Sequence, residues 1–480
     1  MTPKDTAARF FRSAGAATFS QLWRVGVTFA IRLLLRRLVE PADWGLWDWA
    51  LSVFLVLGAV RDLGLVYHVV RVKPRPYGNL LALELGWGGL LVVATFAGAP
   101  LLSLGYANPN PNVVPVIQAL SLFLLFDGLA SVPRVYFEGE LAIGRAVVPE
   151  LVRNLVFAAT SVALAYFGHG VWSLVVAHVA AAGVYAAHLW LRAYPRIPLR
   201  WERGKTMSLL RASIPLALIW FLIILTRQAG PLILATKYPG AVVGTYGFAF
   251  ETTFLVSTIL VPAVARALYP ALVAFAAKPR QSFEAYRLAT LFVLTLEAPA
   301  AVFLFANAEV AIRILGGEAW VDAPRFLRIL CFAPLIDPLT RLGGELLKTY
   351  HRDWIWILSS TITLFSLCTG GILLTRTMGA EGMAWANYLA FGGILMAYGI
   401  YKVSPESFRA LVKEVALVYL VPVPVFLAAY LAAGDDLWLR FALSIAALAV
   451  SLAVYAKRFG ASFVTFFRGA EGATAATGDG

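Results

Sequence analysis

The chain has 480 residues, of which 60% are hydrophobic and only 14% are charged, and its mean hydropathy is +0.76. Soluble domains average about 45–50% apolar and about 25% charged residues, so this composition excludes an ordinary soluble protein. The formal net charge is +13. Most cations flank apolar runs, which indicates membrane topology and argues against a nucleic-acid-binding surface. Cys331 and Cys368 both fall inside apolar runs, so we interpret them as buried hydrophobic residues without a disulfide role.

Apolar runs long enough to cross a bilayer, which takes about 20 helical residues, recur along the whole chain. We predict an all-α polytopic membrane protein with about fourteen transmembrane helices. The first run has no short apolar core followed by a cleavage site, so we expect it to be retained as a helix. The predicted spans are 14–38, 44–66, 79–102, 113–133, 147–167, 171–191, 213–236, 242–264, 287–306, 325–347, 354–375, 381–401, 414–433 and 437–456.

Lysine and arginine concentrate in every second gap between these spans, and the basic segment 192–211 carries the most of them. Cytoplasmic loops carry an excess of such cations, so we predict that these gaps face the cytoplasm. Both termini are then cytoplasmic, which agrees with an even number of crossings.

The chain also shows a halfway repeat on either side of the basic segment. Gly45-Leu-Trp-Asp-Trp-Ala50 aligns without gaps with Gly244-Thr-Tyr-Gly-Phe-Ala249, and Pro41 or Pro239 precedes each copy. Chance remains an alternative, because glycine and aromatic matches are common in membrane helices. Duplicated helical bundles with a site between the halves are a frequent transporter plan. We predict two pseudo-symmetric six-helix lobes, two additional transmembrane helices and a disordered tail, at residues 1–200, 201–412, 413–468 and 469–480.

Four motifs, in order and at the expected helix numbers, resemble those of one transporter family. Leu38-Val-Glu-Pro-Ala-Asp-Trp-Gly-Leu46 is similar to an L-G-P-x-x-[YF]-G turn, although Glu40 replaces the usual glycine and places an anion there. Asp62-Leu-Gly-Leu65 resembles D-x-G-[LI] at the end of the second helix. Gly170-Val-Trp-Ser-Leu174 resembles the start of the sixth helix, and Gly244–Ala249 resembles the start of the eighth.

The family with these motifs is the polysaccharide, or O-antigen-type, flippase branch of the MOP superfamily, related to the lipid II flippase and the MATE exporters. The resemblance implies movement of undecaprenyl-pyrophosphate-linked oligosaccharide from the cytoplasmic to the outer leaflet of the bacterial inner membrane, for cell-surface polysaccharide and lipopolysaccharide biosynthesis. The expected partners are this substrate, membrane lipids and polysaccharide assembly enzymes. We expect a monomeric secondary or facilitative transporter that is not an enzyme. We expect it to bind no nucleic acid, metal or cofactor, and coupling to H+ or Na+ stays an open alternative.

Arginines inside the predicted spans favour an anion path independently of the resemblance. Each costs about 2.5–3.5 kcal/mol at the bilayer centre on insertion scales, so we expect these side chains to face a wet cavity or carboxylates. Arg24 and Arg32 share a polar stripe of the first span with Ser20, Gln21, Thr28 and Arg36. Guanidinium groups match phosphate geometry. The candidate pyrophosphate-binding residues are Arg24, Arg32, Arg227 and Arg341.

A purely structural interpretation stays open for each of these residues. Arg36 suits snorkelling at the membrane rim, and Arg341 lies at helical spacing between Asp337 and Glu345, as in an internal charge ladder. Among the acids, Glu251 and Asp48 are the candidate coupling or counter-ion residues, because membrane carboxylates serve either role.

Three other function classes remain as alternatives. A MATE-like cation or drug exporter is the rival transporter, and it would require acids without an arginine stripe. A membrane glycosyltransferase or polymerase is less favoured, because the longest outer loop, 307–324, is too short for a folded module. A structural scaffold is the third. Gly204-Lys205-Thr206 resembles the end of a phosphate-binding loop, but Leu199 stands where its first glycine belongs, so ATP hydrolysis is not expected.

Overall fold

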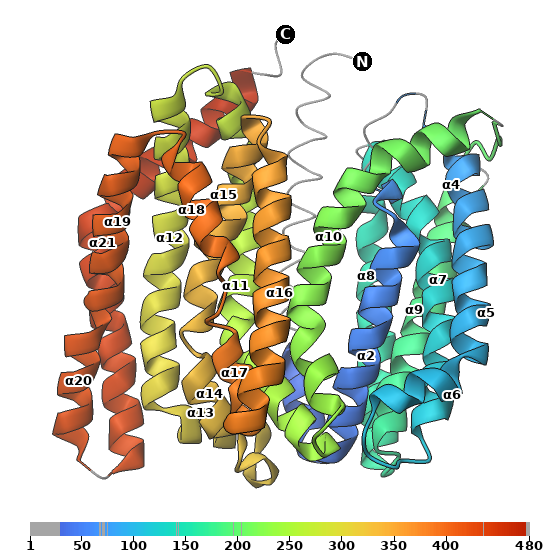
Figure 1. Cartoon of the computed structure of the whole chain (residues 1–480), viewed down its shortest axis with the longest axis horizontal. Coiled ribbons are helices and arrows are strands. Elements are labelled where there is room, and N and C mark those ends of the chain that lie inside the picture. Colours follow the sequence, from blue (N-terminus) through green and yellow to red (C-terminus); the bar gives the residue numbers. More distant parts are fainter. Residues whose placement is uncertain are drawn as a thin grey trace. The chain divides into compact units, whose positions relative to one another are not determined.

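The computed structural model describes residues 29–66, 69, 73, 75–140, 142, 144–194, 196–202, 204–434 and 436–476. All the regular elements in this described part are helices, as the composition predicts, and they are shown in Figure 1. Eleven of them are long and apolar enough to cross a membrane. The chain divides into two compact units, Met1–Gly244 and Thr245–Gly480, each of which is described separately. The predicted lobe boundary at residues 200/201 differs from this division and stays a prediction.

The first unit is a bundle in which α2 packs on α10 and on α7, while α9 packs on α7 and α8. The third predicted span is built from α4, a π-helical turn η1, α5 and α6. The helices of the first unit are α2 (Pro41–Asp62), α4 (Tyr77–Leu83), η1 (Glu84–Gly88), α5 (Gly89–Ala97), α6 (Ala99–Leu102), η2 (Ser103–Gly105), α7 (Val113–Gly139), α8 (Gly144–Tyr166), α9 (Val171–Ala193) and α10 (Lys205–Ala235).

The second unit is centred on α12, which packs on α15, α19 and α21. The helix α11 begins in the first unit with residues 240–244 and continues through the second unit. The helices are α11 (Gly240–Ala274), α12 (Pro279–Ala306), α13 (Ala308–Gly316), η3 (Glu318–Trp320), α14 (Ala323–Leu330), η4 (Ala333–Ile336), α15 (Asp337–Thr349), α16 (Asp353–Thr377), α17 (Glu381–Ala386), α18 (Gly392–Tyr401), α19 (Pro405–Leu420), α20 (Pro422–Ala433) and α21 (Leu437–Ala476). The last of these continues into the tail that we predict to be disordered.

Three of the fourteen predicted spans are not among the eleven long helices. The first span lies mostly outside the described residues, although residues 29–38 are helical. The tenth span is interrupted between α14 and α15, where Pro334 and Pro338 each lack a backbone N–H. The twelfth is interrupted between α17 and α18, and there the Ser359 hydroxyl donates to the Gly392 carbonyl at 2.7 Å. Non-helical backbone at membrane depth needs such internal partners.

A buried asparagine fastens the long basic segment to the first unit. The Asn79 amide on α4 donates to the Glu202 carbonyl at 2.9 Å and to Thr206 Oγ1 at 2.8 Å, and its own oxygen accepts the Glu202 N–H at 3.1 Å. Because Asn79 is fully buried, these bonds satisfy polar groups that would otherwise be costly to bury. The segment that connects α9 and α10 is therefore held in place at Glu202.

Candidate functional site

The predicted arginine stripe of the first helix is only partly visible. Arg24 lies outside the described residues. Arg32 is half-buried in the helical residues 29–38, within electrostatic reach of His178 on α9. Arg36 is buried, and its guanidinium carbon lies 4.1 Å from the ring centre of Trp44. This cation–π contact gives Arg36 a packing role at the start of α2.

Two further candidates lie on the paired helices α2 and α10 of the same unit. Asp48 is 9% exposed on α2, one turn before Ser52, whose hydroxyl lies 2.8 Å from Gln228 Oε1 on α10. Arg227 is half-buried on α10, next to Gln228 in the sequence. The structure therefore brings α2 and α10 together next to the positions of Asp48 and Arg227. Both residues belong to the first unit, as Arg32 does.

The other two candidates, Arg341 and Glu251, belong to the second unit. Arg341 Nη1 lies 3.1 Å from Oδ2 of Asp337, which is one turn earlier on α15, so this guanidinium is already paired with a carboxylate. Glu251 is half-buried on α11. The placement of Arg341 agrees with the structural interpretation that the sequence left open, while its role toward substrate stays a prediction.

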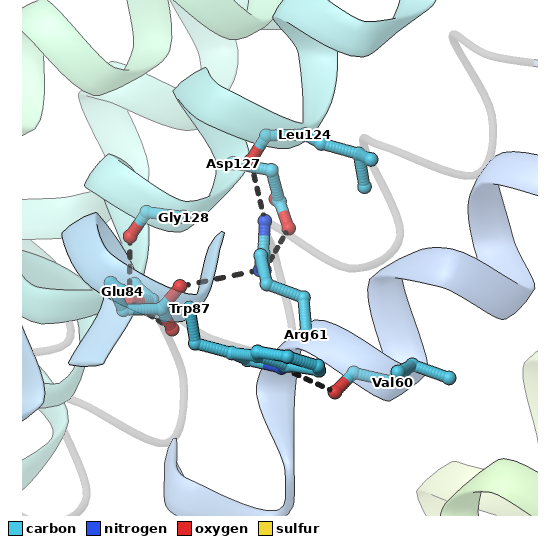
Figure 2. Close-up of polar contacts among 8 residues, drawn as sticks. Val60, Arg61, Glu84, Trp87, Leu124, Asp127 and Gly128 are labelled. Atoms are coloured by element: carbon cyan, nitrogen blue, oxygen red, sulfur yellow. Dashed lines mark hydrogen bonds and ion pairs between the residues drawn. The ribbon is translucent and has the colours of Figure 1, made fainter. Parts of the chain in front are cut away.

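A buried charge cluster joins three helices of the first unit and is shown in Figure 2. Arg61 at the end of α2 is 4% exposed, with its Nε 3.3 Å from Glu84 Oε2 and its Nη2 2.7 Å from Asp127 Oδ2. Arg61 Nη1 also donates to the Leu124 carbonyl at 2.8 Å. The Ser131 hydroxyl lies 3.0 Å from Glu84 Oε1. One guanidinium therefore links α2, η1 and α7.

Local backbone features place these side chains. Glu84 begins the π-helical turn η1, an irregularity that often marks functional positions. Immediately after Arg61, α2 ends in the left-handed conformation at Leu63 and Gly64, with φ of 46° and 67°. A Cβ on Gly64 would lie 2.8 Å from the Ser213 carbonyl oxygen of α10. The D-x-G-[LI] motif therefore ends the helix and allows close approach of α10.

The sequence reasoning missed this cluster, because Arg61 was not among the arginines that we singled out. A signal was nevertheless present. Arg61 lies near the end of the second predicted span, Glu84 near the start of the third and Asp127 near the end of the fourth, so antiparallel packing places all three toward the same end of the helices. Buried ion pairs seldom add net stability, but losing one partner is strongly destabilising. We therefore regard the cluster as a fixed internal junction.

The first motif, at the start of α2, contacts the third motif, at the start of α9. The Asp43 carboxylate accepts a hydrogen bond from the Val171 N–H, the first residue of α9. The preceding Gly170 has φ of 53°, and the space where its Cβ would point is occupied by Asp43. Asp43 thus caps α9, and the first and third motifs form one packing unit.

A cavity of about 380 Å³ opens in the second unit among α13, α14 and the start of α21. Its three arginines are paired with carboxylates: Arg313 Nε lies 3.0 Å from Glu318, Arg328 Nη2 lies 2.8 Å from Glu309, and Arg325 faces Glu381 at 3.9 Å. These guanidinium groups are therefore neutralised locally. Such a cavity is a weaker anion site than unpaired arginines would provide.

Comparison with solved structures defines the class of fold. The lipid II flippase MurJ in an inward closed conformation has a TM-score of 0.75 at 12% identity, covering 94% of this chain and 99% of that chain. An inward-facing multidrug resistance MATE transporter of the MOP superfamily has a TM-score of 0.67 at 14% identity, covering 82% and 99%. The chain has the fold of these multi-pass transporters.

Sequence comparison identifies the family. The family model described as "Polysaccharide biosynthesis protein" matches residues 34–325, more than half of the chain, so this protein belongs to that family. The succinoglycan biosynthesis transport protein ExoT of Rhizobium meliloti (strain 1021) is 24% identical over 345 residues, which are 69% of this chain and 68% of the relative. The resemblance stated from the four motifs is confirmed.

Proposed function

We propose that this protein moves undecaprenyl-pyrophosphate-linked oligosaccharide from the cytoplasmic to the outer leaflet, for the biosynthesis of a cell-surface polysaccharide. The observation that carries the proposal is membership of a polysaccharide biosynthesis family in a chain with the fold of the lipid II flippase. A relative named as a transport protein of succinoglycan biosynthesis supports it. The proposed location is the bacterial inner membrane, with both termini in the cytoplasm.

The proposed substrate contacts are guanidinium groups that replace water around the pyrophosphate. Arg24, Arg32 and Arg227 carry this role in the proposal, since a bidentate guanidinium matches phosphate oxygens and is more weakly hydrated than an ammonium group. Arg341 would act beside the Asp337 carboxylate, with which it is already paired at 3.1 Å. Asp48 and Glu251 serve as counter-ions or coupling groups.

The proposed mechanism is alternating access, in which two halves of the transporter expose one site to each side in turn. The membrane potential supplies about 2.3 kcal/mol per charge per 100 mV. A pyrophosphate with roughly two negative charges is therefore driven out of a negative cytoplasm by about 4–5 kcal/mol per 100 mV. This drive requires no ATP site, and the lipid tail can remain in the bilayer.

The test is transport by the purified protein in vesicles that contain a defined polyprenyl-pyrophosphate-linked oligosaccharide. We expect protein-dependent movement of the saccharide between leaflets, which a lectin or glycosidase outside the vesicles detects, and a faster rate with the potential negative on the donor side. A cationic dye in the same vesicles is the matched control. Movement of the dye without movement of the saccharide would replace this proposal with the drug-exporter alternative.

A further inference from the structure

The interruption of the predicted tenth span creates a half-helix that begins with an acid. α15 starts at Asp337, directly after the short turn η4, and runs for 13 residues. A carboxylate in the first turn of a helix is stabilised as an anion by the aligned backbone N–H groups. Arg341 Nη1, one turn later, adds an ion pair at 3.1 Å. Asp337 therefore has two electrostatic partners, the start of its own helix and Arg341.

A second acid, Glu297 on α12, lies beside this half-helix in a different environment. Glu297 is 3% exposed, and among the described residues neither of its carboxylate oxygens has a hydrogen-bond partner of ordinary geometry, apart from a looser contact with the Ser257 hydroxyl. An ionised carboxylate without partners in a buried site costs several kcal/mol. The buried environment of Glu297 therefore disfavours its anion, whereas Asp337 has Arg341 as an ion-pair partner.

Ser257 on α11 connects the two acids. Its hydroxyl is within reach of Glu297 and lies 2.8 Å from Asp337 Oδ2. A hydroxyl has one hydrogen to donate but can accept others. Because that hydrogen is directed to Asp337, Ser257 can offer Glu297 only an acceptor. A protonated Glu297 would then donate to Ser257 Oγ. Every polar group in the row Glu297–Ser257–Asp337 would then have a hydrogen-bond partner.

The charges around Glu297 lead to the same conclusion. The charged groups whose fields it feels are Asp337 and Arg341, both on α15. From α19, the Tyr419 phenol also faces Glu297, but its hydrogen is donated to the Leu335 carbonyl at 2.9 Å. Two carboxyl groups thus share one guanidinium. A single proton on Glu297 makes the site neutral.

The geometry points to Glu297 as a proton-binding residue, connected through Ser257 to the partly exposed pair Asp337–Arg341. In the relay, the Glu297 O–H bond breaks as Ser257 Oγ takes that proton, while the Ser257 hydrogen passes to Asp337 Oδ2. Glu297 is left as the carboxylate and Asp337 as the acid, and the reverse movement reloads Glu297. The Asp337 and Arg341 side chains are 20% and 23% exposed, so this chain of groups ends at partly exposed side chains.

A proton fits this site better than a metal ion. Hard cations such as Ca²⁺ take six or more oxygen ligands, several of them carboxylate or carbonyl oxygens. Within the described residues, there is no group of three or more His, Cys, Asp or Glu side chains that could hold a metal ion. Coupling of this proton to saccharide movement rests on the proposed function, whereas proton binding itself does not.

Covalent labelling tests proton binding without a transport assay. Dicyclohexylcarbodiimide is apolar and reacts with carboxyl groups that carry a proton in an apolar environment. We expect mass spectrometry of the purified protein to find the adduct on Glu297 at neutral pH, with at least tenfold less on Asp127, a carboxylate paired with Arg61. The adduct should decrease as pH rises. An unlabelled Glu297 in folded protein, or labelling that added Na+ suppresses at constant pH, would overturn the assignment.

Glu297→Gln provides a second readout, because the amide imitates the neutral acid. A buried carboxyl that keeps its proton in the folded state binds more protons folded than unfolded, so stability falls as pH rises. The melting temperature of the natural protein should therefore decrease as pH rises from mildly acidic through neutral values, and that of Glu297→Gln should decrease less. Equal pH profiles for the two proteins would contradict the proposal.

A transport assay separates the proposed function, saccharide translocation, from the proposed proton binding by Glu297. If the saccharide moves, Glu297→Gln should abolish the response of its rate to a pH gradient while leaving the response to membrane potential. A rate in the variant that still follows the pH gradient would refute a coupling role for this proton. If no saccharide moves in the natural protein, the proposed function fails, and the labelling of Glu297 still decides whether the residue binds a proton.

Discussion

Gly45 and Gly244, the first residues of the two copies of the halfway repeat, lie against each other in the first unit. A Cβ on Gly244 would lie 2.8 Å from the Gly45 backbone N, and a Cβ on Gly45 would overlap the Gly240 carbonyl. Glycine is required on both sides, because backbone meets backbone there. The repeat motif is therefore a crossing of α2 with the first turn of α11 that tolerates no side chain.

Gly45→Val should prevent this crossing and destabilise the protein strongly. The added side chain meets backbone atoms, which cannot rotate away as a side chain would, and overpacking typically costs about 1–3 kcal/mol or more. We expect a lower melting temperature and a smaller monodisperse peak in detergent size-exclusion chromatography. The matched control is Gly89→Ala in α5, where an added Cβ has no atom within 4 Å. Equal stability of Gly45→Val and Gly89→Ala would show that the crossing is dispensable.

Arg61→Ala should be among the most destabilising single substitutions in the first unit. It leaves Glu84 and Asp127 without their shared guanidinium, and removal of one partner from a buried pair costs about 3–5 kcal/mol. Thermal unfolding followed by tryptophan fluorescence in detergent measures the change. The double variant Arg61→Met with Glu84→Gln should recover part of the loss, because it removes two of the buried charges.

The surface ion pair of Arg280 with Glu406 provides the control for this prediction. Its side chains are 81% and 80% exposed, so Arg280→Ala should leave the melting temperature unchanged within error. An Arg61→Ala protein that is as stable as Arg280→Ala would mean that the cluster in Figure 2 is not formed in the membrane.

Gly170→Ala should disturb the contact between the first and third motifs. Gly170 has φ of 53°, and Asp43 occupies the place of the missing Cβ. Gly168→Ala is a close control, because Gly168 has φ of 77° but no atom within 4 Å of an added Cβ. Both variants carry backbone strain of about 1–3 kcal/mol, and only Gly170→Ala should also displace Asp43. Equal melting temperatures for the two variants would rule out the capping role of Asp43.

Hydropathy predicted the long helices well, because each one must present about 20 apolar residues to lipid. It did not predict the interruptions in the tenth and twelfth spans, since a window average is insensitive to a few residues of irregular backbone. Pro334 and Pro338 were the available signal for the first of these. The four motifs identified the family, and the structure assigns all four to close helix packing, at Gly45, Gly64, Gly170 and Gly244.

The charged residues were harder to predict, because a sequence does not reveal which helix faces which. Arg61, Glu84 and Asp127 come from three separate helices, and only the packed structure shows one guanidinium between two carboxylates. The same holds for Glu297, which the sequence presented as one of several membrane acids. Arg341, a candidate substrate ligand for which the sequence also indicated a charge ladder, has an ion-pair partner one turn away, and its role toward substrate stays a prediction.

Asn79→Ala should loosen the basic segment without damaging the transmembrane bundle. The substitution removes three hydrogen bonds and leaves the Glu202 backbone N–H and carbonyl without this partner. We expect limited proteolysis to cleave within residues 196–204 much faster than in the natural protein. The Asn79→Asp variant, which retains the acceptor for the Glu202 N–H, should be intermediate. Unchanged cleavage in Asn79→Ala would indicate that the segment is held by other contacts.

The most direct test of the central claim is saccharide translocation by arginine variants in vesicles. The natural protein, Arg32→Ala, Arg227→Ala and the surface variant Arg280→Ala are compared at equal reconstitution with the same polyprenyl-pyrophosphate-linked oligosaccharide. We predict that the first two variants lose at least tenfold in rate, whereas Arg280→Ala equals the natural protein. Undiminished translocation by both Arg32→Ala and Arg227→Ala would contradict an arginine-lined path for the pyrophosphate.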